Sequence, residues 1–197
     1  MLAGARGGCP SARAKMSSAN TAPDGSFGVP RALARVLIIG CGCRGRSLAA
    51  ELIARGHAVR GTTRDAGRTG EMETAGVEAV LADPDRVMTL TPAISGVAVV
   101  CVLLGSAEGP PDAVAALHSE RLEMLLTRVL DTPVRGFVYE SSGSAEETVL
   151  AGGASLVRSF CSMSRIPFAL LDRVGSEGWS AWTVRGADAV DGVLTPE

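Results

Sequence analysis

The chain of 197 residues has a formal net charge of −2, with 46% hydrophobic and 4% aromatic residues. This length suffices for one domain of about 150 residues that buries most of its apolar surface without metals or disulfides. Residues 1–35 hold five basic residues against one acidic, whereas the remainder holds 14 basic and 20 acidic. Such an acidic body argues against a nucleic-acid partner. The longest apolar run, residues 97–104, is far below the roughly 20 residues that span a bilayer, which argues against a membrane partner.

Residues 1–35 are predicted to be a disordered or leader segment. They are rich in Ala, Gly, Ser, Pro and Arg, and they lack the continuous apolar stretch of a signal peptide. Two alternatives are an Arg/Ser-rich transit peptide and an over-extended start that precedes the true one at Met16. We therefore expect the folded domain to occupy residues 36–197.

The most informative stretch, residues 36–64, has the pattern strand, glycine turn, helix, strand. An apolar run of the length of a buried parallel strand is followed at once by G-x-G-x-x-G and then by a helical pattern. Gly40 permits the tight turn, Gly42 lets the backbone approach a diphosphate, and Gly45 lets helix and strand pack closely. This context predicts a dinucleotide site; the alternative is a glycine-rich turn that binds nothing.

The end of the second predicted strand indicates which dinucleotide is bound. An NAD site places an acidic residue there for the ribose 2′-hydroxyl, whereas this chain has Thr63 and Arg64. A guanidinium binds a 2′-phosphate through charge-assisted hydrogen bonds. Cys43 and Arg44 lie in the glycine turn, where helix N–H groups face the phosphates and Arg44 adds positive charge. We therefore predict NADP rather than NAD, the alternative for Arg64 being a solvated strand-end residue.

Strands and helices continue to alternate to the end of the chain. This alternation predicts an α/β fold, a single-domain doubly wound parallel sheet of the Rossmann type with six strands and right-handed crossovers. Trp179, Trp182 and Val190 are expected to face inward from the closing helix. The further strands are expected at 77–81, 97–104, 134–139 and 166–171, and the further helices at about 85–95, 112–130, 146–164 and 179–194.

The five cysteines are odd in number and lack the spacing of a zinc site, so no metal is expected. Cys41 and Cys43 lie at a predicted helix N-terminus, a position that lowers a thiol pKa. Small-residue packing and redox sensing are the two interpretations of this pair. Reduced thiols indicate a cytoplasmic location.

From residue 36 to about residue 173 the chain resembles the short-chain dehydrogenase/reductase superfamily, in particular its atypical extended branch of epimerase/dehydratase-like, NAD(P)H-binding proteins. The matching pieces are GCGCRGRSLAAELIARGHAVRGTTR, residues 81–84 and FVYESSGS. The resemblance implies an active-site serine at Ser141 or Ser142. It also implies cofactor contacts at Gly40, Gly42 and Gly45 for the diphosphate, Arg64 for the 2′-phosphate, Asp83 near the adenine, and Leu103, Leu104 and Gly105 beside the cofactor.

The chain departs from this superfamily in its chemistry. The usual acid is a Tyr in Tyr-x-x-x-Lys, but the single tyrosine here is Tyr139 and the single lysine is Lys15, so no such pair exists. His118 is either a proton donor that reaches the cleft or a solvated helix residue. Glu140 is either an acid or base at the cleft edge or an ordinary strand-end charge.

These observations predict an NADP(H)-binding protein that reduces a small carbonyl or quinone-like substrate, with Ser141 or Ser142 polarising the oxygen. A non-catalytic dinucleotide sensor or regulatory protein is the main alternative. A third hypothesis is that the protein is a homodimer in which the active site is completed across the subunit interface.

Overall fold

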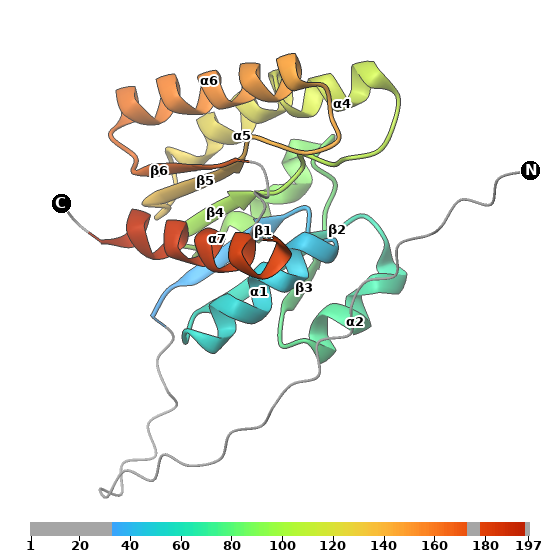
Figure 1. Ribbon diagram of the computed structural model, residues 1–197, viewed down its shortest axis with the longest axis vertical. Helices are drawn as coiled ribbons and strands as arrows, with labels where there is room; N and C mark the ends of the chain where they lie inside the picture. The colour runs from blue at the N-terminus through green and yellow to red at the C-terminus, as the bar shows by residue number, and fades with distance from the viewer. Residues whose placement is uncertain (1–32, 173–177, 196–197) are drawn as a thin grey trace, which may run out of the picture. The chain divides into compact units, whose positions relative to one another are not determined.

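The computed structural model describes residues 33–172 and 178–195, which contain a six-stranded parallel sheet in the order β3-β2-β1-β4-β5-β6 (Figure 1). This is the strand order of a doubly wound Rossmann sheet, so the predicted fold class is confirmed. Most of the predicted leader, 1–35, falls on residues outside those described. The strands are β1 (Arg35–Ile39), β2 (Ala58–Thr63), β3 (Glu78–Leu81), β4 (Val99–Val102), β5 (Gly136–Glu140) and β6 (Phe168–Leu171).

Helices cover both faces of the sheet, with α1 and α7 on one face and α5 and α6 on the other (Figure 1). Among the described residues, no helix combines the length and the apolar content that a bilayer crossing requires. The helices are α1 (Cys43–Ala54), α2 (Thr69–Thr74), α3 (Thr91–Ile94), α4 (Pro111–Leu117), α5 (Glu120–Val129), α6 (Glu147–Ser164) and α7 (Gly178–Leu194), with 3₁₀ turns η1 (Ala66–Arg68) and η2 (Val87–Leu90).

The two central strands, β1 and β4, are apolar on both faces because each face is covered by helices. In β1, Leu37 and Ile39 pack with α5 and α6, whereas Val36 and Ile38 pack with α1 and α7. All four side chains are fully buried. The apolar run that predicted the first strand therefore supplies both halves of the core.

The structure corrects one of the predicted helices and confirms another, which continues across a pair of glycines. The helix expected over residues 112–130 is broken into α4 and α5 at His118, which is buried and whose Nδ1 lies 2.7 Å from the Tyr139 hydroxyl. Conversely, Gly152 and Gly153 do not interrupt α6. Gly153 is required there, because a Cβ at this position would overlap the Tyr139 hydroxyl. The core around Tyr139, not local propensity, sets both outcomes. The helix α2 was not predicted.

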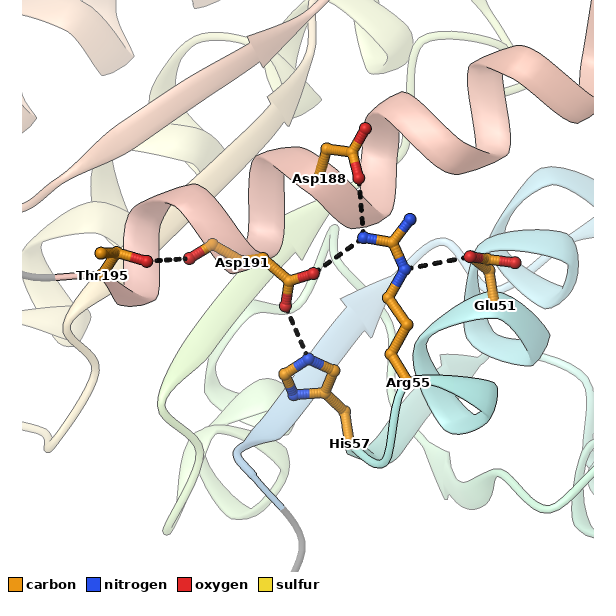
Figure 2. Close-up of polar contacts among 6 residues, drawn as sticks. All are labelled: Glu51, Arg55, His57, Asp188, Asp191 and Thr195. Carbon is orange, nitrogen blue, oxygen red and sulfur yellow. Dashed lines mark hydrogen bonds and ion pairs between the residues drawn. The ribbon is translucent and has the colours of Figure 1, made fainter.

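A polar cluster joins α7 to α1 at the edge of the sheet where β2 begins (Figure 2). Arg55 at the end of α1 donates hydrogen bonds of 2.7 Å each to Asp188 and Asp191, and one of 3.0 Å to Glu51. Nε2 of the buried His57 lies 2.8 Å from the second oxygen of Asp191. Desolvation raises the pKa of Asp191, but the hydrogen bonds from Arg55 and His57 outweigh it and hold the pKa below its usual value.

We expect Asp191→Asn to destabilise the protein by about 1 kcal/mol at neutral pH, because the carboxylate joins two partners in a partly exposed cluster. A carboxyl whose pKa is depressed by folding stabilises the fold above its unfolded pKa and loses this contribution as the pH falls through the folded value. The deficit should therefore shrink below about pH 4. Urea unfolding at neutral and acidic pH measures it, with Asp188→Asn as the control that should show a smaller effect. An equal deficit at both pH values would contradict this assignment.

Candidate functional site

A cleft of about 600 Å³ lies along the carboxyl ends of the strands. This volume is within the usual range for small-molecule sites. Open parallel sheets bind ligands at this edge, beside the point where the strand order reverses, which here is between β1 and β4. Eight of the predicted cofactor residues line the cleft: Gly40, Gly42, Cys43, Arg44, Thr63, Arg64, Leu103 and Leu104.

The three glycines of the turn differ in what their missing side chains allow. Gly40 has a positive φ of 87°, and a Cβ there would overlap the carbonyl oxygen of Leu103. A Cβ on Gly45 would lie 2.9 Å from the Gly40 oxygen, so this glycine permits close packing rather than lining the cleft. Gly42, the N-cap of α1, has open space where its Cβ would be. The turn therefore leaves room for a ligand over the N-terminus of α1, which fits a dinucleotide diphosphate.

The two cysteines of the turn have different environments. Cys41 is buried, and its side chain packs against Gly61 of β2. A Cβ on Gly61 would overlap the Cys41 sulfur. Burial raises the pKa of Cys41 to about 11, against the opposing charge of Arg46, so the expectation of a lowered thiol pKa is wrong for this residue. Cys43 is exposed and lines the cleft, with Arg46 Nη2 at 3.7 Å from its sulfur.

Two arginines lie where β2 meets the cleft. Arg64 and Arg68 both line it, although Arg68 was not predicted as a site residue. The neighbouring carboxylate of Asp65 does not line the cleft, because Oδ1 accepts a hydrogen bond of 2.8 Å from Gly67 N in its own turn. Its Oδ2 lies 3.9 Å from Arg68 Nε. At this end the cleft therefore presents guanidinium groups and no carboxylate from the described residues.

Glu140 lies at the carboxyl end of β5, where it is 1% exposed and lines the cleft. One oxygen accepts a hydrogen bond of 2.9 Å from Gly105 N, and the other pairs with Arg44 of the glycine turn. The Arg44 guanidinium lies 4.9 Å from the ring centre of Trp179, which also lines the cleft. Trp179 was expected to face inward but is 52% exposed; Trp182 and Val190 are buried as predicted.

Five predicted site residues lie near the cleft without lining it: Gly45, Asp83, Gly105, Ser141 and Ser142. The Asp83 carboxylate accepts a hydrogen bond of 3.1 Å from Asp85 N within its own turn. Gly105 packs against the backbone of Ser142, where a Cβ would overlap the serine carbonyl. The Ser141 hydroxyl donates a hydrogen bond of 3.2 Å to the Leu171 carbonyl.

His118 and Tyr139 form a buried pair outside the cleft lining. Burial lowers the pKa of His118, against the Leu104 carbonyl, which raises it. Burial, and secondarily the charge of Glu140, raises the pKa of Tyr139. The expectation of a solvated His118 is therefore wrong, and neither side chain lies where a cleft proton donor would.

Sequence reasoning missed three features of the cleft. Arg68 follows Arg64 at helical spacing, a signal that could have predicted it. The pairing of Arg44 with Glu140 and the position of Trp179 depend on contacts between distant segments, and the sequence contains no local signal for either.

Comparison with solved structures shows the fold. UDP-glucose 4-epimerase from Thermotoga maritima aligns with a TM-score of 0.60 at 14% identity, over 70% of this chain and 54% of that one. Vestitone reductase from alfalfa gives 0.56 at 18%, over 71% and 56%. Triphenylmethane reductase from Citrobacter sp., complexed with NADP(H), gives 0.55 at 18%, over 71% and 49%. The chain spans about half the length of the solved structures that it first matches.

The comparison with curated proteins finds no match. The family model described as NAD(P)H-binding matches residues 40–159, which begin at the glycine turn and end within α6. This match covers more than half of the chain. The protein therefore belongs to the NAD(P)H-binding family.

Proposed function

We propose that this protein is an NADP(H)-dependent oxidoreductase acting on a small carbonyl or quinone-like substrate. The single observation that carries the choice of dinucleotide is the pair Arg64 and Arg68 at the end of β2, where the nearby carboxylate of Asp65 turns away to its own loop. Arg64 is exposed and has no ion pair with the described residues. A 2′-phosphate would supply the anion that the Arg64 guanidinium lacks.

The rest of the cleft fits the remainder of the dinucleotide. Gly42 and the N-terminus of α1 would hold the diphosphate, and Leu103 and Leu104 would lie beside the ring systems. Bound NADP(H) supplies hydride chemistry. The chain's own contribution is the ion pair of Glu140 with Arg44 in the cleft lining, together with the indole of Trp179. Among the predicted catalytic serines, Ser141 is engaged with a backbone carbonyl, so any polarising role would require it to exchange that partner.

A non-catalytic dinucleotide sensor is the second candidate. It is favoured by the burial of the single tyrosine, which is bonded to His118 and does not line the cleft. NADPH oxidation against a panel of carbonyls and quinones, measured beside direct binding, separates the two: binding without turnover supports the sensor. For either candidate function we propose a cytoplasmic location and a homodimeric state.

We predict that the protein binds NADPH at least ~10-fold more tightly than NADH, because charge-assisted hydrogen bonds contribute roughly 1.5–3 kcal/mol each. Arg64→Ala should remove most of this preference and Arg68→Ala a smaller part, and both should leave NADH affinity almost unchanged. Calorimetric titration of both dinucleotides measures this, with Arg158→Ala on the outer surface of α6 as the control. Equal affinities in the native protein would contradict the choice of NADP.

Tyr139→Phe should destabilise the fold by about 1–3 kcal/mol, because it leaves a buried nitrogen of His118 without its partner. It should leave NADPH affinity and any turnover nearly unchanged, since the hydroxyl does not face the cleft. Thermal unfolding and steady-state kinetics measure the two effects. A fall in turnover of ~100-fold or more, the scale for loss of a general acid, would make Tyr139 catalytic after all.

A further inference from the structure

Glu140 is the one carboxylate that is buried among the described residues. Its charge is balanced by two donors from other loops: the guanidinium of Arg44 and the backbone N–H of Gly105. A buried carboxylate is costly unless it is paired, so this arrangement depends on Arg44 staying in place. The Glu140 side chain also lines the cleft. A ligand bound there would therefore change the pairing of the Glu140 carboxylate with its two donors.

Arg44 is the partner that a bound dinucleotide would compete for. It belongs to the first turn of α1, two residues after Gly42, where the cleft is open toward the helix N-terminus. Its side chain is 27% exposed, whereas that of Glu140 is 1% exposed, so the arginine can change partner more easily than the acid. A diphosphate at this helix N-terminus would bring two negative charges close to both residues.

We propose that Arg44 exchanges Glu140 for the diphosphate when a dinucleotide binds, and that Glu140 takes up a proton from solvent in the same step. The proton adds to the carboxylate oxygen that Arg44 leaves, while the other oxygen keeps the Gly105 N–H. No other bond forms or breaks, and release of the dinucleotide reverses the exchange. The inference rests on dinucleotide binding as proposed above.

Two effects act in the same direction. A buried carboxyl that loses its cation binds a proton more readily, and so does one that acquires an anionic neighbour. The product is a neutral carboxyl group with one O–H donor inside the cleft. In a chain without the Tyr-x-x-x-Lys pair, this group would supply the proton for a reduced carbonyl oxygen.

The other titratable groups near Glu140 either have partners of their own or are exposed to solvent. Tyr139, its chain neighbour, points its hydroxyl to His118. Glu108 lines the cleft but is exposed, and Arg46 pairs with Glu71. Beyond β6, Asp172 lies 3.6 Å from Arg185 of α7. None of these carboxylates depends on Arg44.

Calorimetry in two buffers of different ionisation enthalpy counts the protons taken up on binding. NADH is the ligand of choice, because the 2′-phosphate of NADPH is a monoester that titrates near pH 6 and would add its own protons. At neutral pH we expect a net uptake of protons when NADH binds, because the buried carboxylate loses its cation. The linked effect is an affinity that weakens as the pH rises, by up to about tenfold per pH unit for a full proton.

Glu140→Gln should abolish the uptake and flatten the pH dependence, since the amide oxygen still accepts the Gly105 hydrogen bond but cannot titrate. Glu108→Gln, the matched cleft carboxylate, should keep both. Circular dichroism checks that each variant is folded, and if Glu140→Gln is not, the native protein in two buffers still decides. NADH binding without proton uptake would overturn this inference alone, whereas failure of both NADH and NADPH to bind would contradict the proposed function.

Discussion

The buried carboxylate of Glu140 holds together the segments that form the cleft. It extends from β5, accepts a hydrogen bond from the loop after β4, and pairs with the turn after β1. These three segments belong to neighbouring strands or follow them at the carboxyl edge of the sheet. Because a charge with so little solvent exposure must keep its partners, these three segments cannot move independently while the pair is intact. The cleft is therefore shaped by an ion pair as well as by the glycine turn.

The helix α7 connects this edge of the sheet with the opposite one. With 17 residues it extends about 25 Å, nearly the width of a small domain. Near its start Trp179 packs over the Arg44 guanidinium, and near its end Asp188 and Asp191 bind Arg55 (Figure 2). Trp182 and Val190, between these contacts, are buried against the sheet. A single helix is thus anchored at one edge and contributes an aromatic wall to the cleft at the other.

The sequence predicted well those features that depend on neighbouring residues. The strand, glycine turn and helix at the start of the domain follow from local periodicity and from the need for small residues at Gly40 and Gly45. The doubly wound parallel sheet also follows, since alternating strands and helices leave few topologies. Thr63 and Arg64 were placed at the cleft because a strand's carboxyl end can be located from its apolar run.

What could not be predicted depends on contacts between distant segments. Arg44 and Glu140 are 96 positions apart, and neither has a local signal for the other. The break between α4 and α5 reflects the burial of His118 against Tyr139, which overrides a continuous helical pattern. Asp83 and Asp65 follow strand ends, but their carboxylates accept hydrogen bonds from backbone N–H groups of their own turns. Composition alone does not reveal whether such a carboxylate binds its own turn or faces the cleft.

The most direct test of the central claim is a crystal structure of the protein with NADPH bound. We expect the diphosphate over Gly42 at the N-terminus of α1, the 2′-phosphate within hydrogen-bonding distance of Arg64, and the Arg44 guanidinium turned from Glu140 to the diphosphate. A dinucleotide bound elsewhere, or one whose 2′-phosphate lies away from both Arg64 and Arg68, would contradict it.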